Sequence, residues 1–193
     1  MKTILFHGPS GSGKDTQVDL LVQKYEFESI GTGEMFRTMY KEGDIESIKA
    51  YKYWSKGKLV PNNLVYSMLN RWIKRFDTTK SWAFVSVVRD VGQIPLFDDL
   101  LAKNNRTLNA FVHFLLSEEA AIERMSLRKI CPNCDTTYHE KYKPEKIKIR
   151  LKEYNETIGP IVETYKNRGI LIEIDASPTI EEIHTQLVQK LGL

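Results

Sequence analysis

The sequence predicts an α/β fold in which helices flank a parallel β-sheet. Short apolar runs alternate with longer segments whose apolar residues recur at helical spacing, which is the pattern of βαβ units. A glycine-rich turn at residues 8–13 separates the first apolar run from the first helical segment. Because ligands of such sheets bind beyond the carboxyl ends of the strands, we expect the functional residues to follow predicted strands or to lie in insertions.

Five apolar runs are the predicted strands. They are short and are bounded by turn residues, as buried strands are. The first two end at Gly8 and Gly31, and the fourth leads into Ser117, a residue type favoured at the start of a helix. The predicted strands cover residues 4–6, 27–30, 82–88, 110–116 and 170–174.

The segments between these strands have helical patterns. The last helix has two candidate starts, one at Ser177-Pro178 and one at Thr179, which forms a capping pair with Glu182. The predicted helices cover residues 15–25, short helices over 33–57, one from residue 61, one after residue 117, one over 145–167 and one from residue 177 or 179 onwards.

The composition is that of a soluble globular domain. The chain has 193 residues, of which 41% are hydrophobic and 27% charged, and this balance argues against disorder. No apolar run approaches the roughly 18 residues that cross a membrane, and the segment before Gly8 is too short for a signal peptide. Cys131 and Cys134 are too few for a disulfide framework. We expect a cytoplasmic enzyme or binding protein.

The positive charge of the chain is concentrated in one segment. Residues 128–152 contain eight basic and three acidic side chains, a net charge of +5, whereas the rest of the chain carries −2. A general nucleic-acid binder is usually basic over a wider area, so this distribution favours a small polyanion such as a nucleotide. A solvated helix face and nucleic-acid binding are the alternatives.

The glycine-rich turn fits the phosphate-binding pattern G-x-x-x-x-G-K. Gly8 and Gly13 allow backbone N–H groups to curl around phosphate oxygens, and the following helix N-terminus adds partial positive charge. Lys14 supplies a point charge for the terminal phosphates. Asp15 stands where such loops usually carry Ser or Thr. The turn therefore predicts a nucleoside triphosphate site.

Residues 13–17, Gly-Lys-Asp-Thr-Gln, resemble the GKGTQ of adenylate kinases and other nucleoside monophosphate (NMP) kinases. The resemblance covers essentially the whole chain. It implies a P-loop NTPase-type fold of one domain, with a core (1–30, 61–127 and 145–193), an NMP-binding insertion (31–60) and a short lid (128–144). The ATP contacts that it implies are Gly11, Ser12, Gly13, Lys14, Asp15, Thr16, Arg124, Arg128, Thr137, Tyr138 and Ser177.

Three further motifs resemble the acceptor site of that family. Residues 32–37, Thr-Gly-Glu-Met-Phe-Arg, resemble T-G-D-M-L-R, and residues 57–61 resemble G-x-L-V-P. Arg89 and Gln93 are spaced as in P-R-x-x-x-Q. Taken alone, Thr-Gly-Glu is an ordinary helix entry. The AMP contacts implied by the resemblance are Thr32, Arg37, Lys58, Leu59, Val60, Ser86, Arg89, Gln93 and Arg150.

The third predicted strand departs from the family pattern. The family reads D-G-F-P-R, and this chain has Val85 in place of the aspartate that helps to organise water around magnesium. Magnesium could still be held mainly by the nucleotide phosphates. We expect it to accompany ATP, with Asp15 or Asp90 as compensating carboxylates. The alternative is a slow or catalytically silent nucleotide-binding module.

The lid also departs from the pattern. Cys131 and Cys134 resemble half of the family's zinc-binding set, and the second cysteine pair is missing. A structural zinc needs four ligands, and only Asp135 and His139 are candidates to complete the set. We therefore expect free thiols and no zinc.

The resemblance implies reversible phosphoryl transfer from ATP to AMP, giving two ADP. This chemistry requires positioning and charge neutralisation more than covalent catalysis. A kinase for another nucleoside monophosphate is the nearest alternative. We expect a monomer that binds nucleotides and neither nucleic acid nor membrane. The charges expected to act in catalysis are Lys14, Arg89, Arg124, Arg128 and Arg150.

Overall fold

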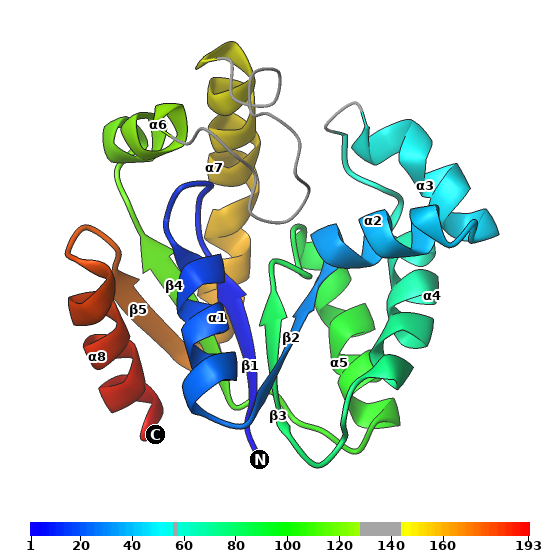
Figure 1. Cartoon of the computed structure of the whole chain (residues 1–193), viewed down its shortest axis with the longest axis horizontal. Helices are drawn as coiled ribbons and strands as arrows, with labels where there is room; N and C mark the ends of the chain where they lie inside the picture. The colour runs from blue at the N-terminus through cyan, green and yellow to red at the C-terminus, as the bar shows by residue number, and fades with distance from the viewer. Residues whose placement is uncertain (56–57, 128–143) are drawn as a thin grey trace.

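The computed structural model describes residues 1–55, 58–127 and 144–193, and its centre is a five-stranded sheet (Figure 1). All neighbouring strands are parallel, in the order β2-β3-β1-β4-β5, so the predicted fold class is confirmed. β1 is central and pairs through Phe6 with both Val85 of β3 and Val112 of β4. The strands are β1 (Thr3–His7), β2 (Phe27–Gly31), β3 (Ser81–Val85), β4 (Ala110–Leu115) and β5 (Leu171–Asp175).

Helices cover both faces of the sheet, which is why its strands are near-continuous apolar runs. Alternate residues of β1 point to opposite faces. Leu5 packs in a cluster with residues of α4, α5 and α7, whereas Ile4 and Phe6 pack with residues of α1 and α8. The helices are α1 (Lys14–Lys24), α2 (Thr32–Lys41), α3 (Ile45–Trp54), α4 (Asn62–Trp72), α5 (Ile94–Lys103), α6 (Glu118–Ser126), α7 (Pro144–Asn167) and α8 (Ile180–Leu191).

Helices α2 and α3 lie beyond the carboxyl end of β2 (Figure 1). Charged side chains join α3 to α4. Asp44 caps α3 by accepting a hydrogen bond from the Ser47 N–H, and its carboxylate also pairs with Arg71 of α4. Arg71 pairs in addition with Glu46, at 2.6 Å. These contacts hold α3 against α4.

The third strand is shorter than the sequence predicts. It ends at Val85, because Ser86 has a φ of 51° and turns the chain out of the sheet. Val87 and Val88 are buried beyond this turn, so their apolar character reflects packing and not strand pairing.

Two helices differ from expectation. α5 has no counterpart among the predicted elements, although Pro95 lies in its first turn. The second of the two candidate starts is correct for α8, because Thr179 and Glu182 form a complete capping box there. Within the described ranges, no helix combines the length and apolar character that crossing a membrane requires.

The capping box gives a testable prediction for stability. Thr179→Ala removes the hydroxyl that accepts from the Glu182 N–H, so it should lower the free energy of unfolding by about 1 kcal/mol. Denaturant titration would measure this change. Ser177→Ala, the matched control at the rejected start, should change it by less than about 0.5 kcal/mol. Equal losses for the two variants would contradict this account of the start of α8.

Candidate nucleotide-binding site

The loop between β1 and α1 has the conformation of a phosphate-binding loop. Gly11 and Gly13 have φ values of 92° and 78°, which favour glycine. A Cβ on Gly11 would lie 3.0 Å from the Ala121 carbonyl oxygen, so a side chain there would push the loop away from α6. The glycines therefore fix both the curl of the loop and its contact with α6.

The N-terminus of α1 is open to an anion. Its N-cap is Gly13, which has no side chain to accept from the first-turn N–H groups. The Ser12 hydroxyl is buried without a partner in the described residues. The Lys14 ammonium lies 3.4 Å from the Asp15 carboxylate, and the Lys14 side chain is only 12% exposed. These donors and the partial positive charge of the helix suit phosphate oxygens.

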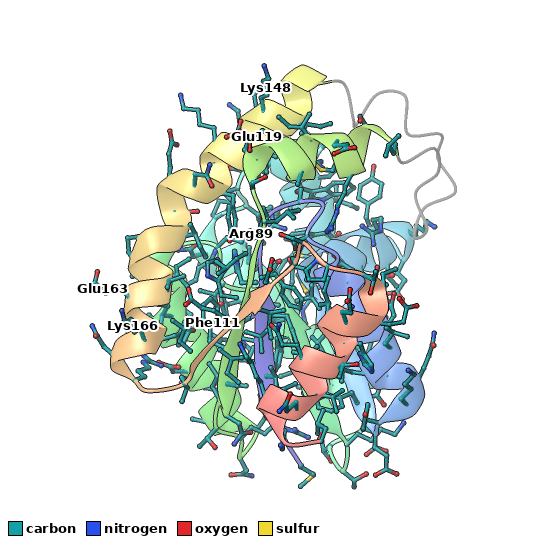
Figure 2. All side chains as sticks on the ribbon, turned by 90° about the vertical axis from the view of Figure 1, so that its left-hand side faces the viewer. Arg89, Phe111, Glu119, Lys148, Glu163 and Lys166 are labelled. Atoms are coloured by element: carbon teal, nitrogen blue, oxygen red, sulfur yellow. The ribbon has the colours of Figure 1, made fainter. Side chains whose placement is uncertain are left out.

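A second loop, residues 86–93, is tied down by its own hydrogen bonds. The Ser86 N–H donates to the carbonyl oxygen of Phe6 (2.9 Å), so the loop starts beside the end of β1. The Gln93 side chain accepts from the Arg89 N–H and donates to Asn62, both at 2.7 Å. The Arg89 guanidinium in turn donates to the Ser86 carbonyl oxygen. Arg89 is thus held near the upper end of the sheet, as Figure 2 shows.

The nine predicted AMP contacts line one cavity of about 650 Å³. They come from α2, from residues 58–60, from the 86–93 loop and from α7, which are far apart in the sequence. The Gln93 side chain is buried, and both its amide oxygen and its amide nitrogen have a protein partner.

The sequence analysis missed an aromatic wall in this cavity. Phe36, Tyr51 and Trp54 line it. The rings of Phe36 and Trp54 are stacked, and Tyr51 meets Trp54 edge to face at 4.9 Å. Such side chains at helical spacing are ordinarily core residues, so only their placement on the cavity reveals them. A flat, polarisable wall suits a planar base or a ribose.

Two smaller cavities adjoin the first, and Ser86 and Arg89 line all three. One of about 320 Å³ lies beside Lys14, Arg150 and His7. The other, of about 530 Å³, lies beside Lys14, Asp15, Asp19 and Val85. The structure therefore brings Lys14, Arg89 and Arg150 around one continuous space at the carboxyl end of the sheet.

The site carries positive charge that nearby carboxylates offset only in part, since the charges of Asp15 and Glu153 oppose the lowering of the pKa of Arg89. The pKa of Arg89 is lowered, first by the surrounding protein and then by the charge of Arg150, although its guanidinium still opens on the cavities. Arginine remains charged after such a shift, so the two cations repel each other. Among the described residues no ion pair joins Arg37, Arg89 or Arg150 to a carboxylate. A bound polyphosphate would relieve this repulsion.

The other predicted ATP contacts divide into two groups. Arg124 of α6 donates to the carbonyl oxygens of Ala176 and Ser177, at 2.7 and 3.0 Å, so the structure brings Arg124 and Ser177 together. They line none of the three cavities. The expected lid residues lie outside the described residues, as do the zinc candidates: Arg128, Thr137, Tyr138, Cys131, Cys134, Asp135 and His139.

The described residues fit a magnesium ion that arrives with a nucleotide. No group of three or more His, Cys, Asp or Glu side chains in the described ranges could hold a metal by protein ligands alone. Asp15 and Asp19 nevertheless line the same cavity as Lys14, and magnesium prefers oxygen ligands and retains waters. Asp90, the other candidate, accepts from the Gly92 N–H and is not among the residues that line the cavities.

Comparison with known proteins identifies one family. The family model described as adenylate kinase matches residues 6–170. The chain is 30% identical to an adenylate kinase of Carboxydothermus hydrogenoformans, over 97% of this chain and 98% of the relative. It is 27% identical to an adenylate kinase of Archaeoglobus fulgidus, over 95% of both chains. It is 29% identical to one of Lachnospira eligens, over the full length of both.

His7 gives a prediction about acid stability. Burial, followed by the charges of Lys14 and Arg89, lowers the pKa of His7 to about 3. Between pH 6.5 and pH 3, His7 is protonated in the unfolded chain, where its pKa is about 6.5, and neutral in the folded protein. The free energy of unfolding should therefore fall as the pH drops from about 6.5 towards 3, by roughly 2 kcal/mol at pH 5 for this residue.

His7→Leu removes this titration. The decrease in melting temperature between pH 7 and pH 5 should be smaller in the variant than in the wild type. His113 and His184, whose pKa values burial also lowers, contribute to the decrease in both proteins. If the melting temperature of the variant decreased between pH 7 and pH 5 by as much as that of the wild type, His7 would not be neutral in the folded protein.

Proposed function

The chain belongs to the adenylate kinase family and transfers a phosphoryl group reversibly between ATP and AMP, and we propose that the three adjoining cavities hold the two nucleotides. One observation carries this assignment of sites. The residues expected to contact AMP line a single cavity, which meets the cavities beside Lys14 at Ser86 and Arg89. Donor and acceptor phosphates would meet at that junction.

In the proposed mechanism, protein charges neutralise the phosphoryl group while it moves. The N–H groups of the loop over residues 8–13 and of the first turn of α1 bind the donor phosphates. Lys14 contacts the terminal phosphates, and Arg89 and Arg150 lie on the acceptor side of the same space. Phosphoryl transfer needs in-line alignment and stabilisation of charge on the equatorial oxygens. Guanidinium groups provide such contacts in a fixed planar geometry.

The acceptor base lies between the aromatic wall and the polar side of the large cavity. Thr32 and Gln93 supply hydrogen-bonding groups on that side, and residues 58–60 supply backbone contacts. Gln93 also fixes the backbone of Arg89 through its accepted hydrogen bond. One side chain therefore links the choice of base to the position of a phosphate-binding arginine.

Magnesium bound to the phosphates supplies charge neutralisation during the reaction. Asp15 orients waters near the phosphates in place of the aspartate that Val85 replaces. We expect Arg124 and Ser177, which lie together outside the three cavities, to contact the part of ATP that extends beyond them. The predicted contacts of Arg128, Thr137 and Tyr138 with ATP stay part of the proposal.

We also propose the division of the chain into a core, an acceptor insertion at 31–60 and a short lid at 128–144 that works without zinc. We expect a cytoplasmic monomer, consistent with a sequence that contains only two cysteines.

The experiment that tests the function is a coupled assay of ADP formation from ATP with AMP, GMP, CMP, UMP and dTMP as acceptors. Activity with AMP well above the others is the expected result. Preference for another acceptor would identify a kinase for that nucleotide. Binding of ATP and AMP without ADP formation would identify a silent module.

Lys14→Ala should lower kcat by at least about a hundredfold, because it removes charge that faces the phosphates. Lys24→Ala is the matched control, since Lys24 lies at the opposite end of the same helix. It should retain the wild-type kcat. Retention of kcat in Lys14→Ala would contradict the assignment of the phosphate loop.

Thr32→Val should raise KM for AMP about five- to tenfold and leave KM for ATP unchanged. The substitution preserves the shape of the side chain and removes a hydroxyl on the acceptor cavity, which is worth about 1 kcal/mol. Initial-rate measurements with each substrate varied in turn would show the difference. Equal effects on both KM values would mean that the acceptor site is wrongly placed.

A further inference from the structure

Tyr154 of α7 contacts two histidines at the carboxyl ends of neighbouring strands. Its hydroxyl lies 2.7 Å from Nε2 of His113, near the end of β4. Its ring is stacked on that of His7, the last residue of β1, with centroids 5.5 Å apart and planes inclined by 22°. Both histidines are at least nine-tenths buried. A side chain of α7 is thus fixed to the strands on which the phosphate loop is built.

The position of Glu173 favours one direction for this hydrogen bond. Burial raises the pKa of Tyr154, so its hydroxyl keeps its proton. Burial lowers the pKa of His113, and the nearby Glu173 carboxylate only partly opposes this effect. The Glu173 carboxylate lies 3.9 Å from Nδ1 and favours a proton on that nitrogen, which leaves Nε2 of the neutral imidazole to accept from Tyr154. The bond joins two neutral groups in a buried setting, where losing one partner is costly.

Arg150 lies one helical turn before Tyr154, on the same side of α7. Arg150 lines the acceptor cavity, and both Arg150 and Tyr154 line the cavity of about 320 Å³ beside Lys14 and His7. On the other side of this contact, His7 leads directly into Gly8, and a Cβ on Gly8 would lie 2.8 Å from that of Phe114 in β4. The start of the phosphate loop and Tyr154 therefore rest on the same two strands.

We propose that Tyr154 and His113 are positioning residues, which set the guanidinium of Arg150 relative to Lys14 across the phosphate-transfer site. The proposal rests on the proposed function. Apolar contacts of Ile161 and Tyr165 hold the later part of α7 on the sheet, but they are non-directional. Nearer to Arg150, Ile147 and Leu151 pack on Ala121 and Met125 of α6, which holds the helix on α6 and not on the sheet. The hydrogen bond to His113 is directional and lies one turn from Arg150, so it fixes the rotation of this part of the helix relative to the strands.

The same helix provides a matched control. Tyr165 is also buried, and its ring is stacked on Phe111 at 4.5 Å, but its hydroxyl has no hydrogen-bond partner in the described part of the chain. Tyr154→Phe and Tyr165→Phe make the same chemical change in α7. We expect Tyr154→Phe to lower kcat about five- to tenfold, with a smaller effect on both KM values. Tyr165→Phe should leave kcat unchanged. Equal effects of the two variants on kcat would overturn the proposal.

A double-mutant cycle separates positioning of Arg150 from a structural role. Once Arg150→Lys has removed the planar guanidinium, adding Tyr154→Phe should lower kcat by less than about twofold. A purely structural role would instead give additive losses, and additive losses would overturn the proposal. Tyr154→Phe leaves the buried Nε2 of His113 without its partner, so a lower melting temperature is expected for that variant. The assays are run well below the lowest melting temperature of the set, so that kcat compares folded proteins.

Substitution of His113 gives an independent test. His113→Leu removes the acceptor and should reproduce the kcat loss of Tyr154→Phe, whereas His113→Gln offers an amide oxygen and should recover part of it. Failure of His113→Leu to lower kcat would overturn the proposal. Wild-type ADP formation from ATP and AMP is measured in the same assay, so its absence would count against the proposed function and not against the positioning role.

Discussion

Arg89 and Arg150 lie close enough at the carboxyl end of the sheet for the charge of one to lower the pKa of the other. No carboxylate of the described residues forms an ion pair with either. Such repulsion drives the two guanidinium groups apart unless the segments that carry them are held in place. Arg89 is held by the hydrogen bonds of the 86–93 loop, and Arg150 by the attachment of α7 to the sheet. The rigid parts of the fold therefore serve to keep positive charge concentrated where an anion is to bind.

Conformational strain accompanies this arrangement. Ser86 has a φ of 51°, which an L-residue adopts at a cost of roughly 1 kcal/mol, and the family motif has glycine at this position. The turn directs the following residues across the ends of the strands. It allows Val87 to accept a hydrogen bond from Tyr66 and Arg89 to reach all three cavities. The loop retains the strained conformation because hydrogen bonds at both of its ends determine it.

The sequence predicted the sheet and the family more accurately than the details of the site. The strands were identifiable because burial on both faces produces short apolar runs. The phosphate loop was identifiable because its backbone requires glycine at positions with positive φ. The predicted third strand wrongly included Val87 and Val88. The composition of this apolar run does not show that Ser86 adopts a left-handed conformation and ends the strand. The aromatic wall was missed for a similar reason. Tyr51 and Trp54 have the spacing of core residues, and only the three-dimensional structure shows that they line a cavity. The partners of Gln93 depend on Asn62, which is distant in the sequence.

The replacement of the family aspartate by Val85 is consistent with the packing around it. Val85 is only 8% exposed and belongs to the apolar cluster of Ile4, Phe6 and Val112. A carboxylate at this strand end would be partly desolvated, whereas Asp15 in the first turn of α1 benefits from the partial positive charge of the helix. Asp19 lies one turn later on the same cavity, and desolvation followed by the charge of Asp15 raises its pKa. The carboxylates that line this edge of the site therefore come from α1 and not from the sheet.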